Sequence, residues 1–230
     1  MSGPAFIFAR GGSKGVPDKN VKQLAGTSLI GRAVECALSS KYVDTVIVST
    51  DSPKIAEAAK SAGASVPFMR PAELATDDSP EILSWRHAID EYESRTATKL
   101  PFFLSVPTTA PLRSVVDIDS CIELFLEKKP ELVITVTPSS HSPWFNMVKL
   151  DSSSKVNMLV PPLANIARRQ DVPKSFNITT VAYVGSPDYI RGTDRLLDGN
   201  VLAVEVPEER ALDIDTSWDF MIAEHALTQQ

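Results

Sequence analysis

The sequence has few of the residues that form cross-links or bind metals. Its 230 residues include two cysteines and three histidines, and no apolar run reaches the length of a membrane-spanning helix. Two cysteines exclude a disulfide scaffold, and together with the histidines they show no zinc-ligand spacing. No cationic and apolar leader is apparent. We therefore expect reduced thiols, a cytoplasmic localisation and no membrane partner.

Basic residues are in the minority. There are 23 lysines and arginines against 29 aspartates and glutamates, which gives a formal net charge of −6. A general nucleic-acid binder usually carries a basic face, so we expect no nucleic-acid partner. An acidic protein that binds an anion must gather its cations in one place.

Three well-known motifs are absent. The chain has no Walker A loop, no G-x-G-x-x-G string, and no serine or cysteine placed with a histidine and an acid as an activated nucleophile. Instead, an apolar segment leads into a loop, residues 9–20, that has three glycines and three cations. Backbone N–H groups and clustered cations bind polyphosphates, although a basic surface turn has a similar composition. The candidate nucleotide ligands here are Ala9, Arg10, Gly11, Gly12, Ser13, Lys14 and Lys19.

Strand-like and helix-like segments alternate along residues 4–137. We predict strands at 4–9, 43–49, 64–69, 102–106 and 132–137, with helices at 29–38, 51–62, 79–92 and 115–127. Strands at 180–184 and 201–206 and a helix at 218–227 follow. This order predicts an α/β fold with a mainly parallel sheet covered on both faces. Ligands of such sheets bind at the carboxyl ends of the strands.

Residues 138–178 interrupt this alternation. They contain five prolines and two short strand-like segments around a serine-rich turn. We predict a small arm inserted into a single domain that spans residues 1–230. Exposed apolar strands need a partner surface, so we expect the arm to form a homodimer; a flap over the site is the alternative.

Two acidic residues near the end of the chain are candidate metal ligands. Asp213 and Asp215 point to the same side of an extended segment. Mg²⁺ takes one or two carboxylates together with phosphate oxygens and water. We therefore expect a Mg²⁺ cofactor here, with helix capping and surface solvation as the alternative for the isolated string.

Polar residues in three connections are further binding candidates. Arg70 either braces Asp77 or contacts a ligand. Thr76, Asp77 and Ser79 are candidates to bind the base or ribose of a nucleotide, with helix capping as the alternative for Ser79. The remaining candidates are Thr108 and Thr109 after a buried strand, and Arg169 and Gln170 where the arm rejoins the sheet. The cations at this last position either bind a sugar carboxylate or solvate the arm.

Five ordered segments resemble the acylneuraminate cytidylyltransferases, which are the CMP-sialic acid synthetases, and their legionaminic and pseudaminic acid relatives. These segments span the chain in order and are the loop 9–20, Val48–Asp51, Arg70–Asp77, Pro111–Arg113 and Asp213–Phe220. The resemblance implies a Rossmann-like three-layer α/β/α nucleotidyltransferase fold with a dimerisation arm.

The resemblance also implies a reaction. CMP would pass from CTP to the anomeric hydroxyl of a 2-keto sugar acid, with release of pyrophosphate. Arg10, Lys14 and Lys19 would hold the phosphates, and Asn20 would contact the nucleotide. Asp213 and Asp215 would hold Mg²⁺, so that Asp215 joins the three cations as a catalytic residue. By the same family pattern, Arg169 would lie near the sugar.

The segments that would contact the sugar depart from the family pattern. Residues 106–113 lack the usual glutamine, and Thr179–Thr180 stand where Asn-Gly is common. The acceptor is therefore left open within the class of sialic-acid-like sugars. The alternatives are a nucleotidyltransferase of the same fold with another sugar or nucleotide, and an inactive nucleotide-binding homologue.

Overall fold

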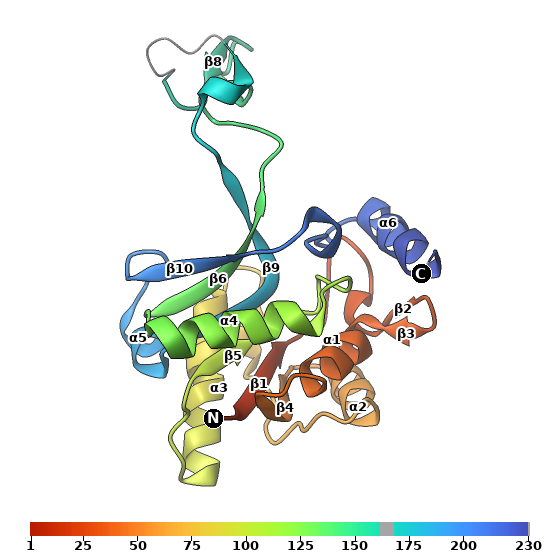
Figure 1. Ribbon diagram of the computed structural model, residues 1–230. Coiled ribbons are helices and arrows are strands. Elements are labelled where there is room, and N and C mark those ends of the chain that lie inside the picture. The colour runs from red at the N-terminus through yellow and green to blue at the C-terminus, as the bar shows by residue number, and fades with distance from the viewer. Residues whose placement is uncertain (162–167, 230) are drawn as a thin grey trace.

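A central six-stranded sheet forms the body of the protein (Figure 1). The computed structural model describes residues 1–161 and 168–229, without the side chain of Arg169. The strand order is β10-β6-β9-β5-β1-β4. In chain order the strands are β1 (Gly3–Phe8), β4 (Val43–Ser49), β5 (Phe103–Ser105), β6 (Leu132–Pro138), β9 (Phe176–Gly185) and β10 (Val201–Glu205).

The helices follow the predicted alternation with the strands. They are α1 (Leu29–Leu38), α2 (Pro53–Ser61), α3 (Glu81–Thr96), α4 (Val115–Lys128), α5 (Pro187–Gly192) and α6 (Ser217–Thr228). Local sequence explains their starts. The Ser28 side chain accepts a hydrogen bond from the Gly31 N–H, and Ser52 caps α2 ahead of Pro53. Thr216 and its N3 residue form a capping box at α6.

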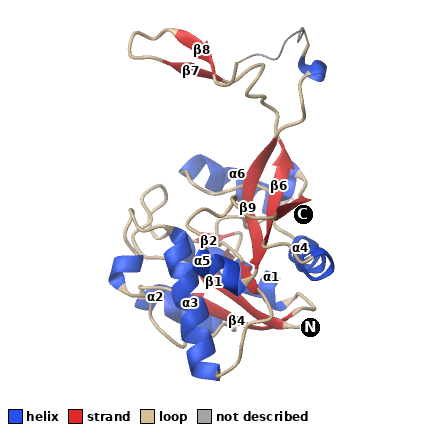
Figure 2. Cartoon of the chain, turned by 90° about the vertical axis from the view of Figure 1, so that its left-hand side faces the viewer, coloured by secondary structure: helices blue, strands red, loops and turns tan. Residues whose placement is uncertain are grey.

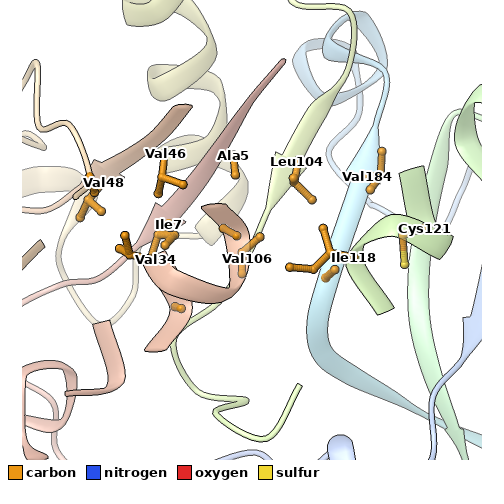
Figure 3. Packing of buried hydrophobic residues seen from close by; sticks show 14 of the residues in the cluster. Ala5, Ile7, Val34, Val46, Val48, Leu104, Val106, Ile118, Cys121 and Val184 are labelled. Carbon is orange, nitrogen blue, oxygen red and sulfur yellow. The ribbon is translucent and has the colours of Figure 1, made fainter. Parts of the chain in front are cut away.

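Two apolar layers lie on opposite faces of the sheet. On one face, alternate residues of β1, β4 and β5 pack against α1, α2 and α4; Figure 3 shows Ile7, Val34 and Ile118 in this cluster. On the other face, Phe6 and Phe103 pack against Trp85 of α3 and Ile190 of α5. Successive residues of a strand point to opposite faces of the sheet. A strand that is apolar at every position is therefore buried on both faces, as is typical of a parallel sheet covered by helices. The three-layer α/β/α prediction is confirmed.

Two features of the sheet were not predicted. Strand β9 runs antiparallel to both β5 and β6, whereas the other paired strands of the sheet are parallel. The predicted strand at 64–69 is wrong, since only Ser65 forms a bridge, to Ile47 of β4. Pro67 has no amide N–H with which to continue that ladder.

A narrow arm projects from the end of β6 and returns through β9 (Figures 1 and 2). Its antiparallel hairpin pairs β7 (Val148–Leu150) with β8 (Val156–Met158), as the sequence predicts. Residues 162–167 of the predicted arm lie outside the described residues. The domain bounds stay a prediction. No helix in the described part of the chain is long and apolar enough to cross a membrane.

Short elements complete the described chain. The hairpin of β2 (Gln23–Leu24) and β3 (Thr27–Ser28) precedes α1. Four single-turn 3₁₀ helices are η1 (Lys19–Val21), η2 (Ala72–Leu74), η3 (Arg169–Asp171) and η4 (Glu208–Arg210). Two of them, η1 and η2, stand next to the cavity that we consider as the functional site.

Candidate functional site

A cavity of about 450 Å³ opens where the loop after β1 meets the segment before α6. Its walls combine residues from both ends of the chain, so the glycine-rich loop and Asp215 share one cleft. The described lining residues are Phe8, Arg10, Ser13, Lys14, Gly15, Lys19, Asn20, Arg70, Leu74, Thr76, Asp77, Ser79, Glu81, Ser84, Thr108, Thr109 and Asp215.

Backbone geometry explains the glycines of the loop. The Gly11 N–H donates to Oδ1 of Asp51 at 2.8 Å, which fixes the loop to the end of β4. Gly12 adopts a φ of +70°, a conformation that disfavours residues with a side chain. A Cβ on Gly15 would lie well under 3.0 Å from the carbonyl oxygen of Asp215. The third glycine is therefore required where the loop packs against the acidic segment.

Lys19 links the two halves of the cavity. Its Nζ donates to the carbonyl oxygen of Ile214 at 2.5 Å and lies 3.6 Å from the carboxylate of Asp215. The Lys19 side chain is only 13% exposed, whereas the Asp215 side chain is 75% exposed. The mostly buried ammonium group of Lys19 and the exposed carboxylate of Asp215 are thus neighbours in the cavity wall.

Two loop cations already hold an anion of the protein. Nη2 of Arg10 lies 2.6 Å from Asp77, and Nζ of Lys14 contacts the other oxygen of the same carboxylate. Hydrogen bonds from Lys14 and Arg10 lower the pKa of Asp77 below its ordinary value. Asp77 therefore stands at the point where these two cations would meet an anionic ligand.

Arg70 is buried behind this ion-pair cluster. Its Nη2 donates to the carbonyl oxygen of Ser49 at 2.7 Å, and its guanidinium stands 5.6 Å from the centre of the Phe8 ring. Burial lowers the pKa of Arg70 to about 10, which leaves the group charged at neutral pH. The alternative that Arg70 braces Asp77 is wrong, because Arg70 is held by Ser49 and Asp77 by the loop cations.

A buried hydrogen-bond chain holds the loop to the next strand end. Thr108 donates to Oδ1 of Asn20 at 2.7 Å, and Nδ2 of Asn20 donates to the Arg10 carbonyl at 3.0 Å. Thr109 pairs with the hydroxyl of Thr180 at 3.1 Å. Asn20 and Thr108 are buried and also line the cavity, so they connect the position of the loop to the cavity wall.

The start of α3 supplies a second polar wall. Ser79 lines the cavity, and its buried Oγ has no hydrogen-bond partner among the described residues. It does not cap α3, whose N-cap is Pro80. Glu81 is an exposed residue overall and also lines the cavity. Desolvation of its carboxyl raises the pKa of Glu81, whereas the Trp85 side chain and the charge of Arg70 act to lower it.

The two predicted metal ligands occupy different environments. Asp215 lines the cavity directly, whereas Asp213 is not among its described lining residues. Oδ1 of Asp213 is buried and has no hydrogen-bond partner within the described part of the chain. A buried carboxylate oxygen without a partner is costly, which makes it a candidate ligand for a cation.

The structure does not bring all predicted site residues to this cavity. Ala9 is buried in the core beside it, and Gly11 and Gly12 shape the loop without lining the space. Gln170 lines a separate cavity at the base of the arm, and the side chain of Arg169 lies outside the described residues. The roles of these residues stay predictions.

Sequence reasoning missed several contributors. It did not single out Glu81 or Phe8, which no motif distinguishes from an ordinary helix start and an ordinary buried strand. Asp51 entered only as the end of one resembling segment, Val48–Asp51, without a role, and its bond to the Gly11 N–H supplies one. The signal for Asp51 was its position directly after a predicted strand.

Fold and cavity together define an α/β protein whose site, at the carboxyl ends of parallel strands, offers a cluster of cations to an anionic ligand. The model of the cytidylyltransferase family matches residues 5–157. The chain belongs to the cytidylyltransferase family and is an enzyme of the nucleotidyltransferase class. This confirms the resemblance inferred from the sequence.

Individual relatives align over nearly the whole chain. The post-translational flagellin modification protein B of Campylobacter coli is 30% identical over 97% of this chain and 94% of its own. The CMP-N,N'-diacetyllegionaminic acid synthase of Campylobacter jejuni is 32% identical over 96% and 93%. The solved CMP-2-keto-3-deoxy-manno-octonic acid synthetase, a complex with CTP, superposes with a TM-score of 0.73 at 15% identity over 100% and 99% of the two chains. This last similarity bears on the fold alone.

Proposed function

We propose that the protein transfers CMP from CTP to the anomeric hydroxyl of a sialic-acid-like 2-keto sugar acid. The anomeric oxygen attacks the α-phosphorus in line, the bond from that phosphorus to the β-phosphate oxygen breaks, and pyrophosphate leaves. The hydroxyl proton passes to solvent. The cavity that joins the glycine-rich cationic loop to Asp215 is the observation that carries this proposal.

The triphosphate is assigned to the loop after β1. Arg10, Lys14 and Lys19 line the cavity from three positions of this loop, together with Ser13 and Gly15. Clustered cations and glycine-rich loops of this kind bind polyphosphates. Positioning and charge neutralisation are the main demands of phosphoryl transfer. For the triphosphate to contact Arg10 and Lys14, the carboxylate of Asp77 must release them.

Base and ribose are assigned to the wall that runs from Arg70 to the start of α3. Thr76 and Ser79 line this wall, and the Oγ of Ser79 is buried without a partner among the described residues. Such a hydroxyl can donate to and accept from a nucleoside. Phe8, whose ring lies under the guanidinium of Arg70, adds an aromatic residue to the lining.

A Mg²⁺ cofactor fits the acidic segment. The partnerless buried oxygen of Asp213 and the exposed carboxylate of Asp215 supply hard oxygen donors, and Mg²⁺ is commonly held by two carboxylates plus substrate oxygens. The described residues form no cluster of three or more acidic, histidine or cysteine ligands. Phosphate oxygens and water would therefore complete the coordination. When bound, the ion would neutralise charge on the phosphates.

The sugar acid is assigned to the side of Thr108 and Thr109, with the arm as a second contributor. Arg169 and Gln170 belong to that arm and are proposed to bind the carboxylate of the sugar. We propose a homodimer as part of this assignment, because an arm that projects from its own body can reach a second copy. Val148, Leu150 and Val156 of the arm hairpin are 51%, 64% and 61% exposed.

A cytoplasmic localisation is part of the same proposal. Cys36 and Cys121 are both free thiols, which accords with a reducing compartment.

Light scattering of the purified protein tests the dimer. A dimer that dissociates when Leu150 and Val156 are both replaced by serine supports the arm as the interface, whereas a monomeric wild type contradicts it.

Pyrophosphate release tests the activity. Wild type is incubated with CTP, Mg²⁺ and each member of a panel of 2-keto sugar acids that includes N-acetylneuraminate and N,N'-diacetyllegionaminate. We expect release with at least one acceptor, and loss by orders of magnitude in Asp215→Asn. Asp198→Asn, an exposed carboxylate outside the cavity lining, is the matched control. Release with UTP or GTP and none with CTP would favour the alternative nucleotidyltransferase, and CTP binding without release would favour an inactive homologue.

A further inference from the structure

A carboxylate in the cavity wall has no role in the proposed phosphate or metal sites. Glu81 begins α3 and lines the cavity with Phe8, Arg70 and Ser79. Arg70 lies close enough to Glu81 to influence its ionisation. The same stretch of wall thus presents a donor-only guanidinium, an acceptor-only carboxylate and a hydroxyl.

The sheet order places Arg70 and the two threonines on opposite flanks of the phosphate loop. Arg70 is held by Ser49 at the end of β4, whereas Thr108 and Thr109 follow β5. Strands β4 and β5 are the two neighbours of β1 in the sheet, and the phosphate loop follows β1. A triphosphate on that loop therefore has the wall of Arg70 on one side and the sugar side on the other.

Cytosine and uracil differ in the group that such a wall would meet. Cytosine presents an exocyclic N4 amine, which is a donor, and uracil presents O4, which is an acceptor at the same position. A carboxylate accepts from the amine but can only repel O4. We propose that Glu81 accepts a hydrogen bond from the N4 amine of cytosine and so determines the preference for CTP over UTP.

The surroundings of Glu81 favour this role. Water is partly excluded from its carboxyl, and a charged hydrogen bond is stronger in such a place than in bulk solvent. The buried Oγ of Ser79, which has no partner among the described residues, can pair with a second atom of the nucleoside. Tyr183, whose ionisation is also influenced by Glu81, packs on Trp85 one turn further along α3. A sugar acid in the cavity is the other ligand that Glu81 could contact. The test must therefore distinguish an effect on the base from an effect on the sugar acid.

The test compares Glu81→Gln with wild type in steady-state pyrophosphate release and in nucleotide binding by calorimetry. An amide can donate to O4 as well as accept from N4, so Glu81→Gln changes the chemistry at nearly constant shape. We expect kcat/KM for CTP to fall about tenfold and the CTP-to-UTP ratio to narrow at least about tenfold, with the KM of the sugar acid unchanged. Glu73→Gln, in the neighbouring 3₁₀ helix η2 and outside the cavity lining, is the matched control and should behave as wild type.

Other outcomes overturn the inference. A Glu81→Gln variant that keeps the wild-type ratio excludes base discrimination by this residue. A variant that raises only the KM of the sugar acid assigns Glu81 to the acceptor. The inference rests on the proposed function, and calorimetry distinguishes the failure of one from the failure of the other. If wild type binds CTP in preference to UTP but releases no pyrophosphate, only the proposed function is contradicted. Wild type that binds CTP and UTP equally fails the inference.

Discussion

Replacing Lys19 by methionine should weaken the use of CTP much more than the use of the sugar acid. Methionine keeps most of the length of the side chain and removes the charge. In the structure, Nζ donates to the Ile214 carbonyl at 2.5 Å, and two of its three donors remain for a phosphate. The side chain is 13% exposed, so solvent screens this ammonium group less than it screens a surface lysine.

The size of the effect follows from the surroundings of Lys19. At an effective dielectric constant of about 20, a unit charge pair about 4 Å apart is worth about 4 kcal/mol, which sets an upper bound. The net contribution of a charged hydrogen bond is about 1.5–3 kcal/mol. Since about 1.4 kcal/mol is a factor of ten, kcat/KM for CTP should fall about 10- to 150-fold.

Steady-state pyrophosphate release, with each substrate varied at saturation of the other, measures this fall. Lys22→Met is the control, because Nζ of Lys22 stands 4.3 Å from the centre of the Phe220 ring and the residue does not line the cavity. A Lys19→Met variant with a KM for CTP within twofold of wild type, or one whose loss is confined to the KM of the sugar acid, would refute the placement of the triphosphate.

Three further changes should have distinct outcomes. Gly15→Ala should reduce the affinity for CTP, measured by calorimetry, because its methyl group would force the loop away from the Asp215 carbonyl; unchanged affinity would contradict this close packing. Thr108→Val should lower the unfolding temperature, because Oδ1 of Asn20 loses a buried donor at a typical cost of about 1–3 kcal/mol, and an unchanged melting curve would count against the buried network. Burial alone would raise the pKa of Glu93, but hydrogen bonds from Lys99, Leu100 and Arg191 lower it to about 2. A depressed carboxyl pKa stabilises the fold above the unfolded-state value of about 4.3, so wild type should lose this contribution between about pH 4 and 2 in acid unfolding, whereas Glu93→Gln should not.

The sequence carried enough information for the layers and for the meeting of the two chain ends. Apolar strands and amphipathic helices alternate regularly, and the carboxyl ends of parallel strands converge at one edge. The loop after β1 could therefore be assigned to the ligand-binding edge of the sheet from element order. The acidic segment before α6 was linked to that loop by the chemistry of a Mg²⁺-bound polyphosphate and by the family resemblance. The N-cap residue of α2 and the capping box of α6 were also readable, because their chemistry is local.

Features that depend on long-range contacts could not be read in the same way. The direction of β9 depends on how the chain returns from the arm, and strand composition does not encode direction. The partner of Asp77 depends on the fold of a loop more than sixty residues earlier in the sequence, so a nearby arginine was as reasonable as the distant cations. The carboxylate of Glu81 belongs to no motif, and only the shape of the cavity reveals it.

The charge balance of the cavity explains how an acidic protein can keep a site for an anionic substrate. Among its described lining residues are four cations, Arg10, Lys14, Lys19 and Arg70, and three carboxylates, Asp77, Glu81 and Asp215. The ligand-free cavity is thus nearly neutral, and two of the loop cations share the single carboxylate of Asp77. Like charges brought together without such compensation would repel one another and destabilise the fold. A triphosphate must therefore displace an internal carboxylate, and its negative charge exceeds the net positive charge that the lining keeps once Glu81 and Asp215 are subtracted. The proposed Mg²⁺ at Asp213 and Asp215 would supply the missing positive charge. The acidic segment, through the ion, and the cationic loop would then both neutralise the triphosphate.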